Sequence, residues 1–488
     1  MAVQTREQEV VEAVEKRLFI GGEWSNARSG GTLAVEDPAT GETLCEISDG
    51  RPEDAMAALD AACAVQDDWA HIAPRERGEI LRRAFETINQ RAEDLALLMT
   101  LEMGKPVADS RAEIAYAAEF FRWFAEEAVR IDGRYAVASN GQGRMLVMRQ
   151  PVGPCLMITP WNFPMAMGTR KIGPAVASGC TMVVKPASQT PLSMLALAQI
   201  LEECGLPSGV LNVITTSSSG ATMAPLIKDG RARKLSFTGS TEVGRTLIAQ
   251  SADQILRVSM ELGGNAPFIV FEDADLDLAI EGAMIAKMRN MGEACTAANR
   301  FHVAESVAGK FTKMLADRMG AMKVGRGTED GVRVGPLINA EARDKVSELV
   351  RDALDKGAKA VVGGESMDGR GYFYQPTVIG DVPSQARVLR EEIFGPVAPI
   401  ASFQSEEEAI NVANDTEFGL VAYVFTNDLK RAIRVVEGLK TGMVGLNQGL
   451  VSNPAAPFGG VKHSGFGREG GAEGIEEYLD TKYVAMNV

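Results

Sequence analysis

Hydrophobic and polar positions along the chain follow two different periods. Residues 18–47 alternate short β-like runs with glycine and Asp-Pro turn signals, which predicts an N-terminal hairpin region. Residues 52–130 carry apolar side chains at three-to-four spacing and predict several packed helices. A stretch rich in Gly, Ser and Asn, followed by an extended run, occupies residues 133–153 and predicts an exposed hairpin.

Beyond residue 153, short apolar runs alternate with amphipathic helices, which predicts an α/β fold with a parallel sheet covered by helices on both faces. Ligands bind such sheets at the carboxyl ends of the strands. A second α/β unit is expected to begin near Glu261, with a helix after residues 273–277 that ends just before Cys295. The predicted strands are 155–159, 181–184, 210–214, 235–237, 266–271, 360–362, 397–403 and 421–425.

The bulk composition excludes several classes of function. The chain has 488 residues, 45% of them hydrophobic, and its 65 acidic and 50 basic residues give a net charge of −15. Such a charge repels polyphosphate, so a nucleic-acid partner is not expected. No run of about 18 apolar residues occurs, so no membrane partner is expected either. The six cysteines form no CxxC pair, which favours reduced thiols, a cytoplasmic location and no metal site.

Two segments carry residue types that suit acyl chemistry. Cys295, in RNMGEACT, follows a helix, where a thiol reaches substrate and becomes a nucleophile once it is ionised. Glu261, in MELGGN, lies between apolar residues at a glycine-rich bend, where loss of solvent raises a carboxyl pKa towards that of a useful base. Each has a structural alternative: a small buried apolar side chain for the cysteine, and a surface carboxylate for the glutamate.

Three segments follow predicted strands and suit a ligand at the edge of the sheet. SFTGSTEVG, residues 236–244, opens a helix whose N-terminus suits a pyrophosphate, although it is not a G-x-G-x-x-G motif. Lys185 ends one strand, and Asn162 in PWNFP follows another, where its amide suits an oxyanion contact. Ordinary turns are the alternative for each segment. The histidines are expected to be structural, namely His71, His302 and His463.

Seven motifs occur in an order and spacing typical of one enzyme family: PWNFP, VVKPASQTP, FTGSTEVG, MELGGN, GEAC, EEIFGPV and APFGGVKHSGFGRE. On these motifs, nearly the whole chain resembles the aldehyde dehydrogenase superfamily. The resemblance implies a Rossmann-type NAD(P)-binding domain, an α/β catalytic domain and a β-hairpin oligomerisation arm, assembled as a homodimer or homotetramer. It places the NAD(P)-binding domain at 1–129 and 149–258, the catalytic domain at 259–449, a return segment at 450–474, and oligomerisation elements at 130–148 and 475–488.

The resemblance also implies individual roles. Cys295 attacks the aldehyde, and Asn162 with the Cys295 backbone N–H stabilises the oxyanion. Glu261 activates the water that hydrolyses the thioester, and Glu469 assists proton transfer. At Ser188 many NAD-preferring members carry a glutamate that would repel a 2′-phosphate, so NADP is expected here, with NAD also accepted. The implied cofactor contacts are Thr159, Pro160, Trp161, Lys185, Ser188, Gly239, Ser240, Leu262, Glu392 and Phe394.

Within the superfamily the chain is most similar to the succinate-semialdehyde dehydrogenases, through the motifs TRK, KMRN and VSN. In that subfamily two arginines and a serine hold the carboxylate of the substrate, so the expected partner is an aldehyde with a distal carboxylate. A structural salt bridge is the alternative for either arginine. The implied substrate contacts are Arg170, Arg289, Ser452, Phe163 and Phe458.

Two departures and several alternatives accompany this interpretation. Glu293 replaces the glutamine of many members, and its charge could raise the pKa of the thiol. Ala297 replaces a cysteine that forms a redox-switch disulfide in some members, so no such switch is expected. Glutarate semialdehyde, or a broader range of aldehydes, remains open, because a pocket discriminates one methylene by only about 1–3 kcal/mol. A non-catalytic protein of this fold is disfavoured by the nucleophile and base, and a thiol hydrolase or acyltransferase by the complete dinucleotide motifs.

Overall fold

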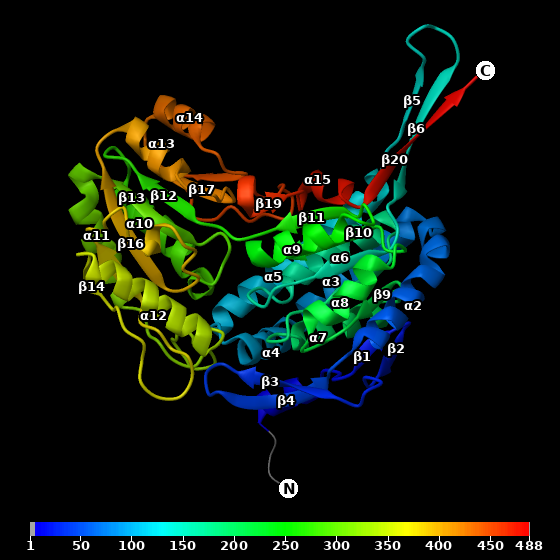
Figure 1. Cartoon of the computed structure of the whole chain (residues 1–488), viewed down its shortest axis with the longest axis horizontal. Coiled ribbons are helices and arrows are strands. Elements are labelled where there is room, and N and C mark those ends of the chain that lie inside the picture. The colour runs from blue at the N-terminus through cyan, green and yellow to red at the C-terminus, as the bar shows by residue number, and fades with distance from the viewer. Residues whose placement is uncertain (1–4, 488) are drawn as a thin grey trace.

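The computed structural model describes residues 5–487, which form two lobes and a projecting arm (Figure 1). The larger lobe holds an eight-stranded sheet and the smaller lobe a seven-stranded one. The predicted α/β class is confirmed. Across the larger sheet the strands are β19 (Gly465–Phe466), β11 (Arg257–Glu261), β10 (Lys234–Thr238), β7 (Cys155–Ile158), β8 (Met182–Lys185), β9 (Leu211–Val213), β1 (Leu18–Ile20) and β2 (Glu23–Ser25).

The five strands from β11 to β9 run parallel, and helices cover them. Strands buried on both faces read as continuous apolar runs, which is why the sequence predicts four of these five. The predicted helical region is confirmed too, and a separate hairpin joins β3 (Thr32–Asp37) to β4 (Glu42–Ser48). The helices of this lobe are α1 (Arg6–Glu12), α2 (Pro52–His71), α3 (Pro74–Gln90), α4 (Ala92–Met103), α5 (Val107–Glu127), η1 (Ala128–Arg130), α6 (Ala166–Ser178), α7 (Leu192–Glu203), α8 (Ser219–Lys228), α9 (Thr241–Ser251), η4 (Lys462–Ser464) and α15 (Gly471–Glu476).

The smaller lobe repeats the arrangement of strands and covering helices. Its sheet runs β14 (Lys359–Val362), β15 (Thr377–Gly380), β16 (Val397–Phe403), β13 (Ala298–Ala304), β12 (Ala266–Val270), β17 (Val421–Phe425) and β18 (Met443–Leu446). Its helices are α10 (Leu276–Met288), η2 (Arg289–Gly292), α11 (Glu305–Gly320), α12 (Ala340–Asp355), η3 (Arg387–Leu389), α13 (Glu406–Asn414) and α14 (Leu429–Gly438). The predicted strands of this region are all present, whereas β13, β15 and β18 are additions. The predicted domain limits remain a prediction.

Strand β13 escapes prediction because Asn299, Arg300 and His302 interrupt its apolar run. All of its residues are nevertheless buried. The Arg300 guanidinium donates hydrogen bonds to backbone oxygens, 2.8 Å from Nη1 to Val412 and 2.9 Å from Nη2 to Ala413. These acceptors satisfy the buried polar group, so a charged residue occupies a core strand without losing its hydrogen bonds.

The helix before the nucleophile ends earlier than predicted. Helix α10 stops at Met288, and Asn290 and Met291 adopt left-handed backbone conformations, with φ of 53° and 57°. Residues other than glycine rarely adopt this conformation. The turn is stabilised by the Asn290 side chain, whose Nδ2 donates to the backbone oxygen of Glu293 at 2.8 Å. The chain therefore leaves the helix axis and carries Cys295 into the space between the lobes.

The arm joins two distant parts of the chain and projects from the larger lobe (Figure 1). Strand β20 (Leu479–Met486) pairs antiparallel with β6 (Arg144–Pro151), which pairs with β5 (Arg134–Val137). The predicted hairpin at 133–153 is confirmed. Apolar side chains stay exposed on the arm, including Tyr135 at 64% and Tyr483 at 60%.

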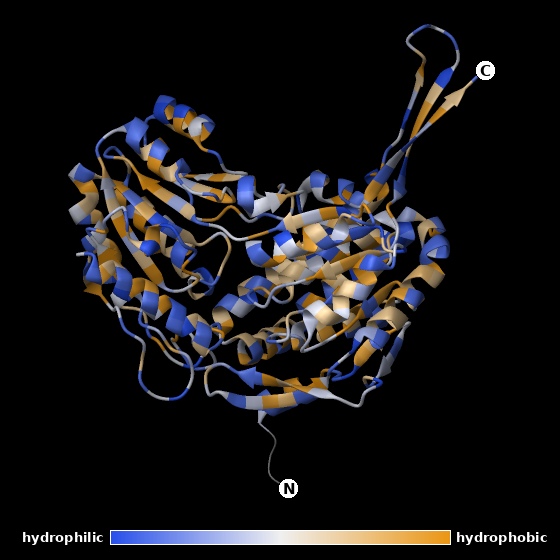
Figure 2. Cartoon of the chain, viewed as in Figure 1, coloured by the Kyte–Doolittle hydropathy of each residue, from blue (hydrophilic) through white to orange (hydrophobic). Residues whose placement is uncertain are grey.

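Hydropathy follows the layers of the fold, with apolar strands lying beneath helices that carry hydrophilic residues on their outer sides (Figure 2). The interior of the larger lobe combines apolar helix faces with the strands β7 to β10, all of whose residues are buried. Within residues 5–487, no helix is both long enough and apolar enough to cross a membrane.

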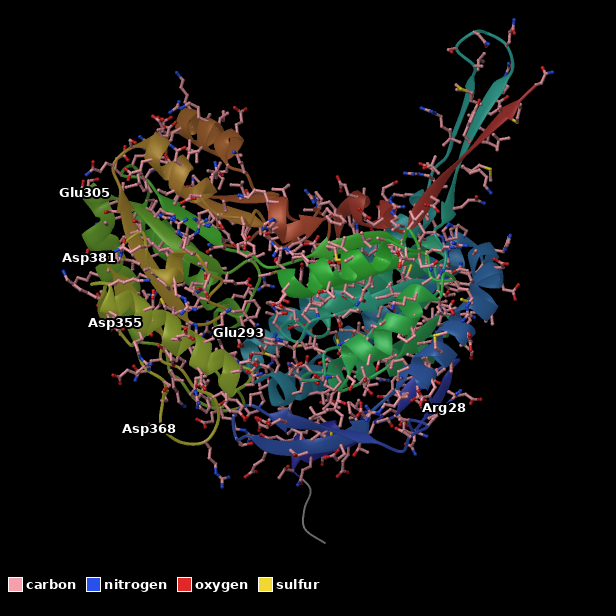
Figure 3. The ribbon with its side chains drawn as sticks, viewed as in Figure 1. Arg28, Glu293, Glu305, Asp355, Asp368 and Asp381 are labelled. Atoms are coloured by element: carbon pink, nitrogen blue, oxygen red, sulfur yellow. The ribbon has the colours of Figure 1, made fainter. Side chains whose placement is uncertain are left out.

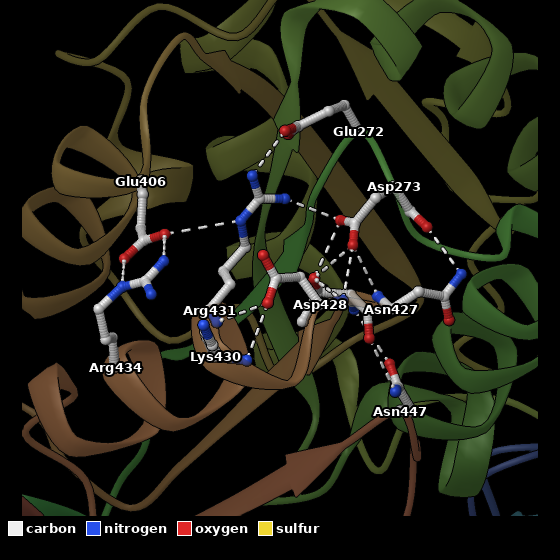
Figure 4. Close-up of polar contacts among 10 residues, drawn as sticks. Glu272, Asp273, Glu406, Asn427, Asp428, Lys430, Arg431, Arg434 and Asn447 are labelled. Carbon is white, nitrogen blue, oxygen red and sulfur yellow. Dashed lines mark hydrogen bonds and ion pairs between the residues drawn. The ribbon is translucent and has the colours of Figure 1, made fainter.

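A polar cluster joins the end of β12 to the end of β17 and the start of α14 (Figure 4). The Asp273 carboxylate accepts hydrogen bonds from the Thr426 hydroxyl and from the backbone N–H groups of Asn427 and Asp428. Arg431 lies 2.8 Å from the same carboxylate. Partial burial alone would raise the pKa of Asp273, but these hydrogen bonds and the charge of Arg431 lower it.

Asp273→Asn is expected to lower the free energy of unfolding by about 2 kcal/mol at neutral pH, because hydrogen bonds to a charged group contribute roughly 1.5–3 kcal/mol. Since the folded-state pKa is lowered, this stabilisation is present above the ordinary aspartate pKa and is lost as the pH falls through the folded value. Urea unfolding at neutral pH and near about pH 3 measures both effects.

The control is Asp317→Asn, which removes an exposed i,i+4 partner of Lys313 and should cost less than about 0.5 kcal/mol. Equal destabilisation by the two variants at neutral pH would contradict the role given to Asp273.

Candidate active site

A cleft of about 940 Å³ lies between the two lobes, beside the carboxyl ends of β7, β10 and β11. This is the position expected for a ligand on a parallel sheet. The cleft brings together many predicted site residues: Pro160, Trp161, Asn162, Phe163, Gly239, Ser240, Glu261, Leu262, Cys295, Glu392 and Phe394. The other predicted residues do not line the cleft itself, namely Thr159, Arg170, Lys185, Ser188, Arg289, Ser452, Phe458 and Glu469.

Cys295 is half-buried on the cleft wall, in the loop after η2. Burial raises the pKa of its thiol to about 12; the positive charge of Arg170 opposes the shift, and the carboxyl groups of Glu392 and Glu261 add to it. The thiol is therefore protonated at neutral pH in the free protein. A neighbouring base must accept this proton before the sulfur attacks a substrate.

Asn162 is held from two sides. Its Nδ2 donates to the backbone oxygen of Glu293 at 3.0 Å. Its own backbone oxygen accepts from Lys105 Nζ at 2.8 Å and from Asn290 Nδ2 at 3.1 Å. An amide nitrogen carries two N–H groups, so one remains for a ligand in the cleft that Cys295 also lines. This arrangement suits the stabilisation of an oxyanion on a carbon bonded to sulfur.

Two buried carboxyl groups near the cleft have opposite environments. Burial, and then the charge of Glu469, raise the pKa of Glu261 well above its usual range. Burial alone would raise the pKa of Glu469 as well, but its ion pairs with Arg170 and Lys171 lower it. Among residues 5–487, Glu261 Oε2 has no hydrogen-bond partner. Glu261 is thus the group free to exchange a proton, and Glu469 is fixed in its ionised form.

Glu261 is enclosed by a close backbone approach. Gly459 has φ of 158°, and a Cβ on it would lie 2.9 Å from Glu261 Oε1. A larger residue at this position would push the carboxyl group aside. The glycine therefore keeps the return segment against the base.

Glu293 lies in the interior between the lobes, whereas Glu305 and Asp381 lie at the outer edge of the smaller lobe (Figure 3). Glu293 Oε1 accepts a hydrogen bond from the Ile338 backbone N–H at 3.1 Å, and Glu293 Oε2 has no hydrogen-bond partner among the described residues. Burial raises the pKa of Glu293 well above its usual range. Burial thus favours the protonated, uncharged form of this carboxyl near the Cys295 thiol.

One end of the cleft has the features of a dinucleotide site. Ser240 caps the N-terminus of α9, whose partial positive charge suits a pyrophosphate. The Thr159 and Thr238 hydroxyl groups lie at the ends of β7 and β10 and have no hydrogen-bond partner among residues 5–487. Lys185 Nζ donates to the Ser219 hydroxyl at 3.0 Å, and burial lowers its pKa to about 8. These unpaired donors and acceptors fit NAD(P).

The facing wall of the cleft carries two more of the predicted cofactor contacts, Glu392 and Phe394. Glu392 Oε1 accepts from the Gly264 backbone N–H at 3.0 Å, and burial raises the pKa of Glu392 to about 7. The rings of Phe394 and Trp161 meet edge to face, with centroids 5.4 Å apart. Lys287 is buried behind this wall, which lowers its pKa to about 7. Both sides of the cleft thus contribute rings and a carboxyl to one ligand.

The two predicted substrate arginines differ in their surroundings. Arg289 donates from Nη1 to the Ser452 hydroxyl at 3.4 Å and lies 4.9 Å from the centre of the Phe163 ring. Within residues 5–487 it forms no ion pair. Arg170 instead is fully buried, pairs with Glu469 and lies 4.1 Å from the centre of the Phe458 ring. Arg170 thus shows the structural salt bridge that the sequence left as an alternative, and Arg289 keeps its charge for a ligand.

Several residues near the site are absent from the sequence prediction. Thr238 lies at a strand end, so the rule that ligands meet strand ends could have found it. The ring centre of Tyr116, on α5, lies 5.6 Å from the guanidinium carbon of Arg289. The spacing of apolar residues along this helix does not predict that contact. Lys105, Glu113 and Asn290 act behind the cleft, and only the folded chain brings them to Asn162.

A buried thiol, an unpaired buried carboxyl and a dinucleotide-shaped cleft define an enzyme that oxidises a carbonyl substrate through a cysteine adduct. The model of the aldehyde dehydrogenase family matches residues 24–484. The chain belongs to the aldehyde dehydrogenase family.

Named relatives agree with this classification over nearly the full length. The chain is 60% identical to a succinate-semialdehyde dehydrogenase of Paenarthrobacter nicotinovorans, covering 91% of this chain and 98% of the relative. It is 49% identical to the NADP(+) succinate-semialdehyde dehydrogenase of Escherichia coli and to a glutarate-semialdehyde dehydrogenase of Pseudomonas putida, each over 97% of this chain and 98% of the relative. The crystal structure of succinate-semialdehyde dehydrogenase from Burkholderia pseudomallei matches with a TM-score of 0.96 at 47% identity, covering 100% of both chains.

The raised thiol pKa predicts how Cys295 reacts with an alkylating agent. Because the thiolate is the reactive form, the rate with iodoacetamide in the free protein should rise about tenfold per pH unit from neutral to about pH 10. Peptide mass spectrometry measures the rate, and Cys295→Ala controls for labelling of the half-buried Cys45 and Cys63. A rate that levels off near about pH 8 would show an ordinary thiol and contradict the burial argument.

Proposed function

We propose that this enzyme oxidises succinate semialdehyde to succinate with NADP, through a thioester on Cys295. The observation that carries the substrate assignment is Arg289, a guanidinium without an ion pair among residues 5–487 that contacts Ser452 and Phe163. A guanidinium beside a hydroxyl matches the bidentate geometry of a carboxylate. The relatives named succinate-semialdehyde dehydrogenase support the same substrate.

The first half of the reaction forms a bond between sulfur and carbon. Cys295 loses its proton to a base, a role that we assign to Glu261 because it lines the same cleft, and the sulfur attacks the aldehyde carbon. The carbonyl oxygen becomes an oxyanion that accepts hydrogen bonds from Asn162 Nδ2 and the Cys295 backbone N–H. When bound, NADP supplies the acceptor for the hydride that leaves this carbon. The carbon is then a thioester carbonyl on Cys295.

The second half hydrolyses the thioester. Glu261 first releases the thiol proton to solvent, and then takes a proton from water as the water oxygen attacks the carbonyl carbon. The carbon–sulfur bond breaks, the carboxylic acid leaves, and the Cys295 thiolate regains a proton. The raised pKa of Glu261 makes it a stronger base once it is ionised, because burial favours its protonated form. We propose that Glu469 assists this proton transfer by holding a negative charge beside Glu261, since its ion pairs with Arg170 and Lys171 keep it ionised.

We propose that the enzyme prefers NADP because Ser188 is uncharged. This side chain is half-buried, and its hydroxyl donates to Gln189 Oε1 at 3.3 Å. It presents no negative charge to a 2′-phosphate, and Lys185, the last residue of β8, lies three residues before it. NAD is expected to bind as well, because nothing in a hydroxyl group repels a free ribose.

Glutarate semialdehyde is the second candidate substrate. It carries the same two functional groups and one more methylene, and a relative of 49% identity bears the name glutarate-semialdehyde dehydrogenase. Arg289 can bind the carboxylate of either substrate. The ratio of the two kcat/KM values therefore depends on the residues around the substrate carbons between the carboxylate and the aldehyde.

We also propose a homodimer or homotetramer in the cytoplasm. The arm carries exposed aromatic side chains, Tyr135 and Tyr483, that a second copy could cover. The six cysteines are all free thiols, which suits a reducing compartment.

The first experiment compares initial rates of reduced cofactor formation for succinate semialdehyde, glutarate semialdehyde and butanal, each with NADP and NAD. We expect the highest kcat/KM for succinate semialdehyde with NADP, because only the carboxylated substrates engage Arg289. Equal values for butanal would leave the enzyme class intact and remove the carboxylate assignment. A higher value with NAD would contradict the Ser188 argument.

Arg289→Leu is expected to lower kcat/KM for succinate semialdehyde roughly 100-fold, since loss of one member of a buried charge pair costs about 2–5 kcal/mol. The effect should fall mainly on KM, because the carboxylate contact is the same in the ground state and the transition state. Butanal should change less than about threefold, since it makes no such contact. Arg318→Leu, on α11, serves as the matched control. Equal losses for both aldehydes would show that Arg289 is structural.

A further inference from the structure

A buried ion pair lies directly behind the predicted oxyanion residue. Lys105 and Glu113 pair with each other, and both side chains have 0% exposure. Neither lines the cleft, and no step of the proposed reaction uses either one. Asp109 also favours the charged form of Lys105, whereas Arg289 opposes it. The pair therefore needs an explanation other than contact with substrate.

Each member of the pair holds a different part of the loop that carries Asn162. Lys105 Nζ donates to the Asn162 backbone oxygen at 2.8 Å and lies 4.5 Å from the centre of the Phe163 ring. Glu113 Oε1 accepts from the backbone N–H groups of Met165 and Ala166 at 3.0 and 3.1 Å. The first turn of α6 and the preceding peptide are thus fixed by one lysine and one glutamate.

Local structure explains why Lys105 points inward. Helix α4 ends at Gly104, which has φ of 93°, and its N–H donates to the Thr100 oxygen at 2.8 Å. A Cβ on Gly104 would lie 2.8 Å from Pro336 Cγ. Only glycine makes this turn so close to Pro336, and the turn directs the next residue, Lys105, back into the core.

The same peptide oxygen is shared with the loop that carries the nucleophile. Asn290 Nδ2 donates to the Asn162 oxygen at 3.1 Å and to the Glu293 oxygen at 2.8 Å. The Asn162 side chain donates to that same Glu293 oxygen at 3.0 Å. If Lys105 were lost, only Asn290 would hold the Asn162 peptide. The Asn162 amide could then rotate away from the carbon bonded to Cys295.

Stability alone does not account for the pair. Buried ion pairs often add little net stability, because desolvation offsets the attraction between the charges. A pair of uncharged side chains of similar volume would keep the core filled. The contacts that such a replacement loses are the ones to the peptide of Asn162.

We propose that Lys105, held by Glu113, is a positioning residue that directs the Asn162 amide towards the oxyanion. This inference rests on the proposed function, because it takes Asn162 as the oxyanion contact. Its effect belongs to the transition state, in which the oxyanion forms, and not to the binding of substrate or cofactor.

The test uses Lys105→Met together with Glu113→Gln, which removes both charges and leaves no unpaired one in the core. The glutamine keeps an oxygen for the Met165 and Ala166 amides. We expect kcat to fall roughly 10- to 100-fold, which is no more than the fall in kcat caused by removing an oxyanion donor. KM and the Kd for NADP should change less than about threefold. Unchanged kcat would overturn the proposal.

The matched control is Lys234→Met with Glu477→Gln, a buried lysine and a partly buried glutamate 3.4 Å apart at the opposite end of β10. It should alter the melting temperature without lowering kcat. An equal fall in kcat for both pairs would mean that any lost buried ion pair slows the enzyme, and the proposal would fail.

A double-mutant cycle separates the inference from the proposed function. In an Asn162→Ala background, the changes at 105 and 113 should lower kcat no further, because the amide they direct is gone. A full additional loss in that background would overturn the positioning role and leave the role of Asn162 intact. If Asn162→Ala itself leaves kcat unchanged, the proposed oxyanion contact fails, whatever the effect of Lys105.

Discussion

The site depends on the buried ion pairs that Glu469 makes with Arg170 and Lys171. They tie the return segment after β19 to helix α6, and Lys171 Nζ also donates to the Ser236 hydroxyl at 2.9 Å. Strand β19 pairs antiparallel with the end of β11, with Gly465 opposite Glu261. The ion pairs therefore hold a fixed negative charge beside Glu261, the proposed general base, in a part of the structure that excludes solvent.

The cations that fix this charge make the pKa values of Glu469 and Glu261 differ, so the two carboxyl groups do not compete for the same proton. Glu469 has cations on both sides and stays ionised, whereas Glu261 has none within hydrogen-bonding distance among the described residues and favours its protonated form. Divergent environments for paired carboxyl groups are how one site holds an acid and a base together. Glu293 follows the same rule, since burial raises its pKa more than the charge of Lys105 lowers it.

Most of the fold could be predicted from the sequence, since buried parallel strands read as apolar runs and the packed helices as three-to-four spacing. Strand β13 could not, because Arg300 satisfies its hydrogen bonds with carbonyl groups of distant residues, namely Asn265, Val412 and Ala413. The early end of α10 could not either, since Asn290 and Met291 adopt a conformation that the side-chain pattern does not encode. In the site, motifs placed Cys295, Asn162 and Glu261 along the cleft. They did not show the pairing of Arg170 with Glu469, because a charge in a motif has no visible partner until the chain folds.

On the proposed function, the substrate extends from the Cys295 sulfur to the Arg289 guanidinium, so the space between these two groups selects its length. An arginine side chain is long and flexible, so alone it would accept either carboxylated aldehyde. Here the guanidinium lies against two rings, 4.9 Å from the centre of Phe163 and 5.6 Å from that of Tyr116. These rings restrict its position, and a substrate with one more methylene must bend to keep both contacts. One methylene commonly changes substrate discrimination by about 1–3 kcal/mol. The free-energy cost of the bend is therefore set by Phe163 and Tyr116. It is not set by the charge of Arg289, which acts on both proposed substrates alike.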